Sequence, residues 1–316
     1  MKMTAISASA DARLWLNGIT RAFEQGAGKE VFPGIWQGLT ALRRELTASE
    51  WSEFGRQLRE EHPMRDFVFQ DPLTYRAFEK PRGYAGDAVM MDHLYGMYLG
   101  VDVFNEASEF GRELFRHIHH GSSGQAVRYR RHLIAELIDE AATRFDSAAV
   151  LAIASGHLRE AELSLQLASG RVSQFVALDA DAESLAEVRR CYTNLGIEAI
   201  HGSVRHLLAG KVALDQKFHL VYAAGLFDYL QDNVAQALTA RMWDLTAPGG
   251  TLLIPNFVPD HDDVAYMEAV MDWHLIYRDS EDMRSLLNRL DPTTIASWDT
   301  FHDDTRSVVF LAVTKH

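Results

Sequence analysis

Val150-Leu-Ala-Ile-Ala-Ser155-Gly156-His157-Leu-Arg159-Glu160 carries the strongest structural signal in this sequence. Its first four residues are apolar, too few for a buried helix but suited to a buried parallel strand. Ser155 and Gly156 then permit a tight turn, and residues 158–168 read as a helix. Helix amides that point outward, next to a glycine that lets the backbone come close, predict a pocket for a ligand with polar or anionic groups.

A second apolar stretch, residues 175–179, ends in the carboxylate of Asp179. In doubly wound folds, an acid at the tip of the strand after the glycine turn receives the ribose hydroxyls of a nucleoside ligand. His157 and Leu158 stand where a dinucleotide fingerprint would carry further glycines, which argues against close approach of a pyrophosphate. A ribose without a pyrophosphate indicates S-adenosylmethionine (SAM) rather than NAD. The alternative is an ordinary strand that ends in a solvated aspartate.

Composition narrows the class of protein. The chain has 316 residues, 47% hydrophobic and 24% charged, which is typical of a globular protein with one or two domains. A net charge of −13 argues against a nucleic-acid partner, because the phosphate backbone is also negatively charged. The local basic run Arg128-Tyr-Arg130-Arg131 is interpreted as a solvated helix face. Cys191 is the single cysteine, as in reducing compartments. With no apolar signal segment and no run that could insert into a membrane, we expect a cytoplasmic enzyme; its oligomeric state is left open.

The first part of the chain, residues 1–147, is expected to be a helical section. Apolar residues recur at helical spacing through residues 12–60. A loop region at about 71–96 follows, where Tyr84 lies between two glycines and Asp87 is expected to cap a helix. We interpret it as a lid over the substrate and cofactor; the alternative is a structural crossing with Tyr84 as an anchor.

The second part, residues 148–316, alternates strands with helices. This order predicts an α/β, Rossmann-like doubly wound sheet, mostly parallel, with helices on both faces. A closing antiparallel hairpin is expected from residues 294–298 and 307–313, and residues 257–288 read as helical. Strands are expected at 150–153, 174–179, 198–201, 217–225 and 251–256, and helices at 182–194 and 232–246.

With these elements in order, residues 148–316 resemble the class I SAM-dependent methyltransferases. The run Leu245-Thr-Ala-Pro248-Gly249-Gly250 matches that family's turn before its fifth strand. The chain departs from the family pattern at Ala152, at His219 and in having a single loop glycine. The resemblance implies SAM as cofactor and S-adenosylhomocysteine as product, with Gly156 facing methionine, Asp179 the ribose and Ser203-Val204 the adenine. The cofactor-binding set expected on this basis is Tyr84, Ala154, Gly156, Arg159, Asp179, Ala180, Ser203, Val204, Ala224 and Gly225.

A narrower resemblance covers residues 70–316. The motifs Ala-Ser-Gly-His-Leu-Arg-Glu, Ala-Gly-Leu-Phe-Asp-Tyr-Leu and Lys-Pro-Arg-Gly-Tyr-Ala-Gly-Asp are similar to bacterial methyltransferases of the type named for 3-hydroxypalmitic acid methyl ester biosynthesis. This similarity implies methyl transfer to a small molecule, with carboxyl O-methylation of a fatty-acid-like or other small carboxylate favoured.

Candidate groups around the transferred methyl come from several segments. A carboxylate or thioether acceptor needs no general base, whereas an amine or hydroxyl does. Arg82, Arg159 or Arg278 could clamp a carboxylate. The catalytic candidates are Tyr84, Asp87, Asp228, Tyr229 and Tyr277. The substrate-binding candidates are Arg82, Trp273, His274 and Arg278.

Four alternatives stay open. The acceptor could be an amino-acid-like molecule methylated on nitrogen or sulfur, with an aromatic cage for a sulfonium. The chain could be a SAM-binding sensor without catalysis. An NAD-dependent oxidoreductase would need the missing pyrophosphate loop. A metal-assisted variant could use residues 260–263, although that run and His117, His119 and His120 are interpreted as ordinary loop and helix-end residues, and no metal is expected.

Overall fold

The computed structural model describes residues 5–96, 103–214 and 216–316, and the chain divides into two compact units. The helical unit consists of Met1–Gln125 and Asp260–His274. The sheet unit consists of Ala126–Pro259 and Leu275–His316. The sheet unit thus begins before the predicted boundary at residue 148, and one later segment belongs to the helical unit.

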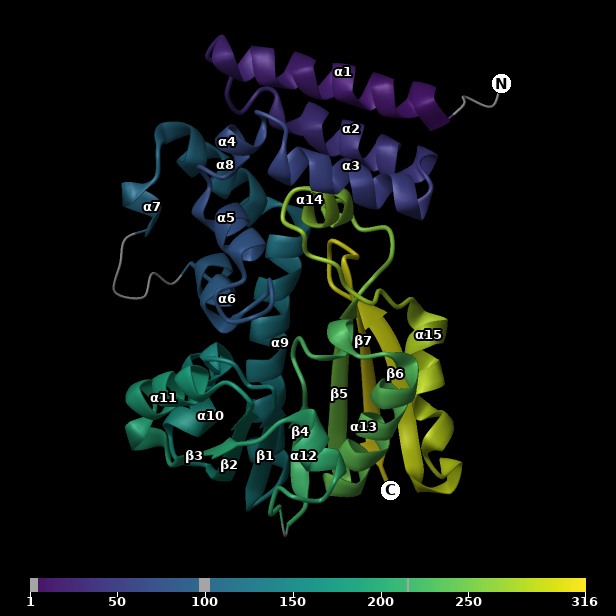
Figure 1. Cartoon of the computed structure of the whole chain (residues 1–316). Helices are drawn as coiled ribbons and strands as arrows, with labels where there is room; N and C mark the ends of the chain where they lie inside the picture. The colour runs from purple at the N-terminus through teal and green to yellow at the C-terminus, as the bar shows by residue number, and fades with distance from the viewer. Residues whose placement is uncertain (1–4, 97–102, 215) are drawn as a thin grey trace. The chain divides into compact units, whose positions relative to one another are not determined.

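The helical unit is built from amphipathic helices, most of them short (Figure 1). Thr47 and Glu50 form a capping box at the start of α3, and Asp71 caps α5 by accepting from the backbone of Thr74. Leu39 and Leu58 are fully buried on the inward faces of their helices, as the helical spacing predicts. In chain order the helices are α1 Ala5–Glu24, α2 Phe32–Glu45, α3 Ala48–Glu60, α4 Arg65–Val68, α5 Pro72–Glu79, α6 Ala88–Leu94, α7 Val103–Glu106, α8 Glu109–His120 and α14 Val264–Ala269.

Residues 260–274 are fixed in the helical unit by contacts of Asp263. The indole Nε1 of Trp36 donates to Asp263 Oδ1 at 2.7 Å, and the backbone N of Ser123 donates to Oδ2 at 2.7 Å. The Trp36 ring stacks on Tyr266, with centroids 4.1 Å apart and planes 9° from parallel. This segment is therefore an integral part of the helical core, although it follows the fifth strand in sequence.

The sheet unit contains one seven-stranded sheet in the order β3-β2-β1-β4-β5-β7-β6. Strands β1 to β5 pair in parallel, and β7 runs antiparallel to both β5 and β6. The predicted parallel sheet and closing hairpin are confirmed. The strands are β1 Ala148–Ile153, β2 Val172–Asp179, β3 Ile197–His201, β4 Phe218–Tyr222, β5 Thr246–Phe257, β6 Ile295–His302 and β7 Val308–Lys315.

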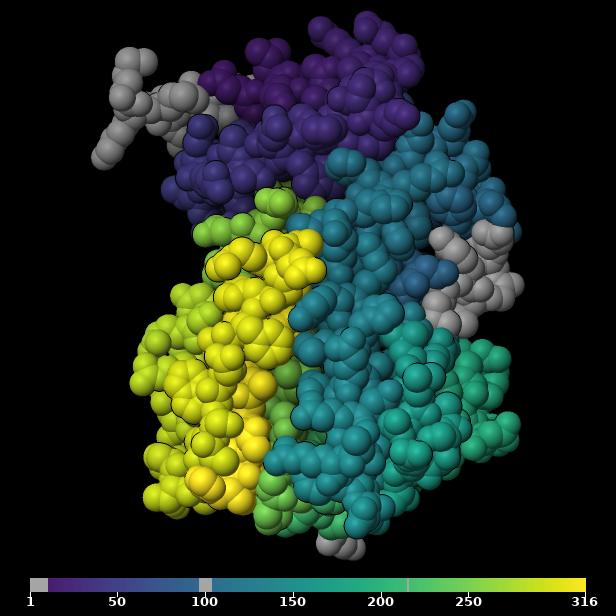
Figure 2. Space-filling model, turned by 180° about the vertical axis from the view of Figure 1, so that it is seen from behind, coloured from purple at the N-terminus to yellow at the C-terminus, as the bar shows by residue number. Residues whose placement is uncertain are grey.

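Helices cover both faces of this sheet (Figure 1). On one face Leu238 of α13 (Asp232–Leu245) belongs to the same buried cluster as Leu151 and Ile254. On the other face α9 (Ser122–Arg144) places Tyr129 edge-on against Phe310 of β7 at 5.8 Å; Figure 2 shows this segment beside the C-terminal hairpin. The remaining helical turns are η1 Arg159–Glu162, α10 Leu165–Ala168, α11 Ala182–Cys191, η2 Thr193–Leu195, α12 Val204–Leu208, η3 Phe227–Tyr229, α15 Ser280–Ser285, η4 Leu286–Arg289 and η5 Pro292–Thr294.

The helix predicted over residues 158–168 is wrong as a continuous element. Leu158 has a φ of 55°, the left-handed region, which ends any right-handed helix at that residue. A 3-10 turn, η1, follows, and Ser164 then caps the separate single turn of α10. The loop after β1 is thus longer than the sequence indicated.

The helix predicted over residues 257–288 is also wrong in its middle. α14, α15 and the start of η4 form, and residues 272–279 hold no helix. Within the sheet unit the backbone N of Ile276 donates to Asp228 O, and that of Arg278 donates to Phe257 O. These amides bond to neighbouring loops instead of to carbonyls four residues earlier, so the segment runs extended.

Among the described residues, none of the helices is both long enough and apolar enough to span a lipid bilayer.

Candidate functional site

The loop that follows β1 has an unusual backbone. Ala154, Gly156 and Leu158 have φ values of 52°, 54° and 55°. Two of the three carry a side chain, so the left-handed conformation costs energy at those positions. Strain of this kind persists where the surroundings enforce it, and the backbone N of Ser155 is held by Leu178 O of β2 at 3.2 Å. The loop is therefore fixed in shape at the carboxyl end of the sheet.

Asp179, at the end of β2, ties this loop to the next one. Its Oδ2 accepts from Gly156 N at 2.7 Å, and its Oδ1 accepts from Asp181 N at 2.8 Å. The residue is 8% exposed, and burial raises the pKa of its carboxyl. Each oxygen has a second lone pair that these bonds leave over. The carboxylate can thus accept further hydrogen bonds from a ligand at the strand tips, next to Ala180.

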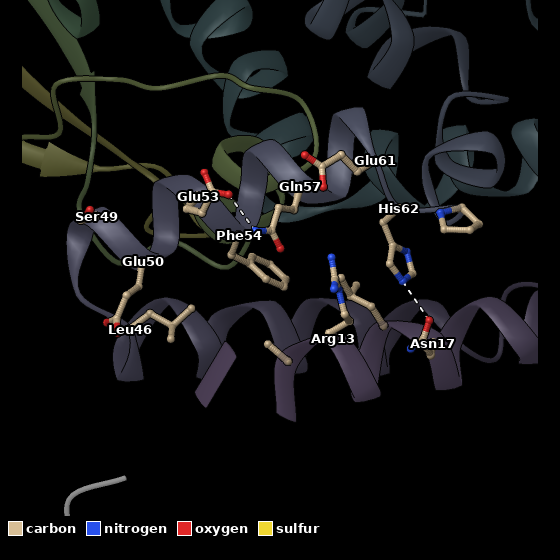
Figure 3. A pocket seen from close by; sticks show the side chains of 13 residues that line it. Arg13, Asn17, Leu46, Ser49, Glu50, Glu53, Phe54, Gln57, Glu61 and His62 are labelled. Carbon is tan, nitrogen blue, oxygen red and sulfur yellow. Dashed lines mark hydrogen bonds between the residues drawn. The ribbon is translucent and has the colours of Figure 1, made fainter. Parts of the chain in front are cut away.

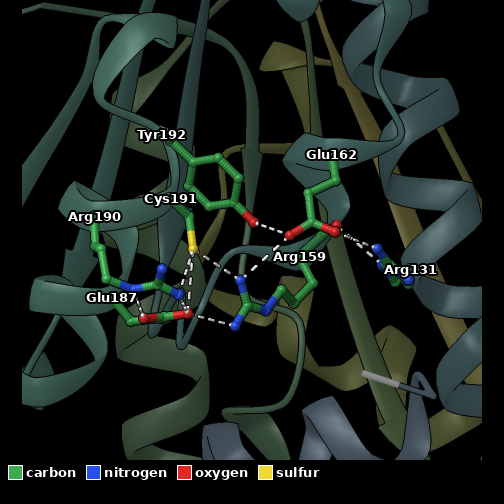
Figure 4. Close-up of polar contacts among 7 residues, drawn as sticks. All are labelled: Arg131, Arg159, Glu162, Glu187, Arg190, Cys191 and Tyr192. Carbon is green, nitrogen blue, oxygen red and sulfur yellow. Dashed lines mark hydrogen bonds and ion pairs between the residues drawn. The ribbon is translucent and has the colours of Figure 1, made fainter. Parts of the chain in front are cut away.

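Arg159 is the centre of an ion-pair network beside the same loop (Figure 4). Its guanidinium is 2% exposed; Nη2 lies 2.7 Å from Glu187 Oε1 of α11, and Nη1 lies 3.3 Å from Glu162 Oε1. Arg131 of α9 donates from Nε to Arg159 O at 3.0 Å and pairs with Glu162 at 3.0 Å. These contacts hold the loop in place, and the expected role of Arg159 as a cofactor contact or carboxylate clamp stays a prediction.

A buried acid-phenol pair lies behind the loop. The hydroxyl of Tyr222, at the end of β4, donates to Glu160 Oε1 at 2.6 Å, and burial raises the pKa of Glu160. Arg130 of α9 is 4% exposed and lowers the pKa of Glu160 against that burial effect. A Cβ placed on Gly225 would come 3.5 Å from Arg130 Nη1, so the turn after β4 lies against this buried guanidinium.

Sequence reasoning missed this group. Arg130 was read as part of a solvated helix face and is buried instead; Arg131 is paired. The available signal was the length of the run Arg128-Tyr-Arg130-Arg131, because four consecutive residues cover a full turn of helix and at least one of them must point toward its packed side.

The tips of β3 and β4 complete the candidate cofactor region. Gly202 is the position after β3 where a Cβ would lie 3.0 Å from both Leu178 Cδ1 and Val212 Cγ2, so a side chain there would press on both methyl groups. Ser203 caps α12 through its Oγ, which accepts from His206 N, and Val204 packs on the sheet core. The hydroxyl of Ser203 is thus committed to the helix. Ala224 and Gly225 follow β4 at the neighbouring tip.

Asp228 stands near the tips of β4 and β5 in η3. Its Oδ1 accepts from Phe257 N at 2.8 Å, and the residue is 3% exposed. Burial raises the pKa of this carboxyl to about 6, while Arg130 and Arg278 act to lower it. Its neighbour Tyr229 is 37% exposed. A carboxylate with a pKa near neutrality can act as a general base.

Arg278 is not available as a substrate clamp. It is 1% exposed and donates from Nη1 to Phe227 O and Asn256 Oδ1, and from Nη2 to Leu230 O and Asp232 Oδ1. Four of its five N–H groups therefore bind the protein. The expectation that Arg278 binds substrate is corrected: it fixes the loops beyond β4 and β5. Tyr277 beside it is half-buried.

The other predicted site residues belong to the helical unit. Asp87 is fully buried, caps α6 through Met90 N and pairs with Arg76 at 2.7 Å, so a catalytic role for its carboxylate is corrected to a structural one. Tyr84 is 36% exposed, in the loop that was expected.

Arg82 is half-buried in the same loop. Trp273 is 7% exposed, and His274 is exposed with its Nε2 3.4 Å from Asp272 Oδ1. Neither of the last two is on the helix that was expected. Within the described part of the chain no group of three or more His, Cys, Asp or Glu side chains is arranged to hold a metal ion.

The chain is similar to known proteins in sequence and in fold. Residues 150–250 match the family model of a methyltransferase domain. No curated protein matches the sequence. A crystal structure of a possible exported protein from Bordetella parapertussis is similar with a TM-score of 0.61 and 17% identity, over 86% of this chain and 98% of that one.

Two more solved structures are similar with lower scores. Magnesium protoporphyrin IX methyltransferase (ChlM) from Synechocystis PCC 6803, with bound S-adenosylhomocysteine, has a TM-score of 0.47 and 12% identity, over 78% of this chain and 100% of that one. The N-methyltransferase NodS from Bradyrhizobium japonicum WM9, in complex with S-adenosylhomocysteine, has a TM-score of 0.43 and 13% identity, over 60% of this chain and 87% of that one. The matched domain spans the strained loop, Asp179 and the tips of β3 and β4, so the sheet unit contains a methyltransferase domain with the class I fold.

Proposed function

We propose that the strand tips of the sheet unit hold SAM with its ribose on Asp179. The observation that carries this is the buried Asp179 carboxylate, which is fixed by Gly156 N and Asp181 N and still has lone pairs for the two ribose hydroxyls. Gly156 then faces the methionine portion, and Val204 with Ser203 borders the adenine. Ala154, Ala180, Ala224 and Gly225 form the backbone around these positions.

The sulfonium of SAM supplies an already activated methyl group. The chain therefore has to align an acceptor in line with the departing sulfur and keep water out. The ion pairs of Arg159 and the bond from Tyr222 to Glu160 serve alignment, because they hold the loop after β1 in one shape.

We propose that the acceptor is a small metabolite methylated on a carboxylate oxygen. A carboxylate attacks a sulfonium methyl without a general base. The resemblance of the loop around Lys80–Asp87 to methyl ester-forming methyltransferases supports this choice. Arg82, which is half-buried in this same loop, is the proposed carboxylate clamp, because a guanidinium can bind a carboxylate through two parallel hydrogen bonds.

A second candidate is methylation of a hydroxyl or an amine, and one observation favours it. Asp228 is a buried carboxyl with a pKa of about 6 next to the tips of β4 and β5. Such a group is deprotonated at pH 7 and can take the proton of an amine or hydroxyl acceptor as the methyl arrives. Tyr229 follows Asp228 in η3, and Tyr277 lies between Ile276 and Arg278, whose backbone N atoms donate to Asp228 O and Phe257 O.

One experiment separates the two candidates. Purified enzyme is incubated with SAM carrying a deuterated methyl group and a metabolite extract, and labelled products are found by mass spectrometry. A methyl ester releases labelled methanol in mild alkali, whereas N-methyl and ether products survive. We expect an ester whose formation persists in Asp228→Asn. An alkali-stable product whose formation stops in Asp228→Asn would establish the second candidate instead.

Tyr84 and Arg82 can be tested in the same assay. Their part in acceptor binding is a prediction from the loop's composition. Tyr84→Phe removes the hydroxyl alone, and Tyr84→Ala removes the ring as well. If both variants and Arg82→Gln turn over the acceptor normally, this loop is structural.

A further inference from the structure

The helical unit contains a cavity between α1 and α3 that no part of the methyl-transfer chemistry uses. Its volume is about 440 Å³. Pockets for small ligands range from roughly 300 to 1,000 Å³ and are lined mostly by apolar groups with a few fixed polar ones. All of its lining residues lie between Ala12 and Pro63, and none belongs to the predicted cofactor set.

The floor of the cavity is apolar. Leu16 of α1 and Phe54 of α3 both line it and are 3% and 9% exposed. Figure 3 shows the ring of Phe54 pointing from α3 toward α1, with Leu46 at one end of the cavity. Such a floor suits an alkyl chain or an aromatic ring, because burying its surface releases water from both sides.

One end of the cavity is closed by an uncharged imidazole in a defined tautomer. His62 Nδ1 accepts from Met64 N at 3.2 Å, so the ring proton is on Nε2, which lies 3.2 Å from Asn17 Oδ1 (Figure 3). Burial and the nearby Arg13 lower the pKa of His62, which keeps it neutral at pH 7. This end therefore adds no positive charge.

The polar rim is negative. Three carboxylates, Glu50, Glu53 and Glu61, line the cavity against one guanidinium, that of Arg13. Arg56 is shared by Glu53, Glu60 and Glu61, at 2.7 Å, 3.0 Å and 2.9 Å, and so offsets only part of the excess. An anionic ligand would meet like charge at this rim, and a cationic one would meet opposite charge.

We propose that this cavity is a second binding site of the protein, for a small amphiphilic cation: an apolar chain or ring that carries an ammonium group. The apolar part lies on Leu16 and Phe54, and the ammonium lies among Glu50, Glu53 and Glu61. The site is separate from the strand tips, and its ligand binds without being methylated there.

The test uses three probes of equal shape and different charge: 3-phenylpropylamine, 3-phenylpropan-1-ol and 3-phenylpropanoate. Each is titrated into the full-length protein at pH 7 by calorimetry or ligand-observed NMR. We expect saturable one-to-one binding of the amine, at least about five-fold tighter than the alcohol, with the carboxylate weakest. No saturable binding of the amine, or equal affinities for the three probes, overturns the proposal.

A pair of variants locates the binding. Ser49→Lys brings an ammonium of the protein's own into the acidic rim and is expected to weaken the amine at least about five-fold. Ser52→Lys adds the same charge to an exposed position of α3 outside the lining and should leave the affinity unchanged. Equal affinities in the two variants contradict the assignment.

Asp179→Ala separates this site from the cofactor site. It is expected to weaken S-adenosylhomocysteine and to leave 3-phenylpropylamine unaffected. Loss of amine binding in Asp179→Ala would place the amine at the strand tips and overturn the proposal, whatever its effect on the cofactor.

Discussion

At the level of single residues, Asp179 joins two loops and faces the position proposed for a ribose. Replacing it by alanine removes charge-assisted acceptors from Gly156 N and from the ligand. The loss of about 1.5–3 kcal/mol for such hydrogen bonds predicts roughly ten- to hundred-fold weaker binding of S-adenosylhomocysteine in Asp179→Ala. Asp179→Asn keeps one acceptor oxygen, so its affinity for S-adenosylhomocysteine should lie between that of the wild type and that of Asp179→Ala. Calorimetry measures all three proteins, and unchanged affinity in Asp179→Ala would remove the ribose assignment.

Asp228 gives a prediction about pH. Burial raises its folded-state pKa to about 6 from 3.8, so the folded protein keeps this proton where the unfolded chain has lost it. Stability from this group is present below pH 4 and is lost as the pH rises to about 6. Asp228→Asn cannot titrate, and its amide oxygen can still accept from Phe257 N. Relative to the variant, the wild type is expected to lose about 1–3 kcal/mol between pH 4 and 7.

The comparison is made by thermal unfolding of both proteins at pH 4.5, 6 and 7.5. The midpoint of Asp228→Asn should rise relative to that of the wild type as the pH increases. A constant difference between the two would mean that the folded-state pKa of Asp228 is close to its ordinary value.

Among the elements, the loop after β1 depends on the network in Figure 4. Arg159 is 2% exposed and pairs with Glu187, while Arg190 pairs with the same Glu187 from the surface, 66% exposed. Arg159→Lys loses the forked geometry that reaches two carboxylates. We expect the KM for SAM to rise about ten-fold with kcat little changed, since a displaced loop misplaces the cofactor.

Arg190→Lys is the matched control for that prediction. It makes the same chemical change on the same carboxylate but does not alter the loop, so its KM should stay within about two-fold of the wild type. Steady-state kinetics at saturating acceptor separate KM from kcat. Equal effects of the two variants would mean that the network contributes only to general stability.

How far the sequence predicts these elements depends on how local their causes are. The strands β1 and β2 follow from short-range apolar patterns, and the structure contains both. The turn at Gly156 and the acid at the end of β2 are equally local features of the sequence. The helix predicted over residues 158–168 fails because Leu158 adopts a left-handed conformation, which a leucine rarely takes and which no local sequence pattern indicates.

The site shows the same limit. Sequence spacing identified Asp179 and Gly156, whose bond the structure contains. It did not identify the pair of Tyr222 and Glu160, because two residues 62 positions apart meet only when β4 is placed beside β1. It also assigned Arg278 to substrate, since nothing local shows that four backbone and side-chain oxygens will surround that guanidinium.

At the scale of the whole molecule, each unit is made from chain segments that are apart in sequence. Residues 260–274 leave the sheet unit and belong to the helical unit. Their two ends come back together in the sheet unit, where Arg278 N donates to Phe257 O at 3.0 Å and Asn256 Nδ2 donates to Ile276 O at 2.9 Å. The segment is therefore an insertion between two neighbouring points of the sheet unit.

This arrangement predicts how the sheet unit can be isolated. A shortened chain of residues 126–316 keeps residues 260–274 without their partners in the helical unit. Tyr266, Met267 and Val270, which are 1%, 3% and 0% exposed in the intact protein, would then meet water. That shortened chain is expected to aggregate. Replacing residues 260–274 in it by four Gly and Ser residues removes this apolar surface, and the short span between Phe257 and Arg278 makes the closure unstrained.

The two shortened chains form a matched pair, because they differ only in that segment. Size-exclusion chromatography and thermal unfolding should show a monodisperse, cooperatively unfolding protein for the replaced version and aggregates for the other.

Two alanine variants of the full-length protein test the same segment. Asp263→Ala leaves the donors of Trp36 and Ser123 unsatisfied and should lower the free energy of unfolding by about 2–4 kcal/mol, whereas Asp262→Ala at the adjacent exposed position should change it little. If both shortened chains behave alike, or if the two alanine variants are equally stable, residues 260–274 are held by the sheet unit after all.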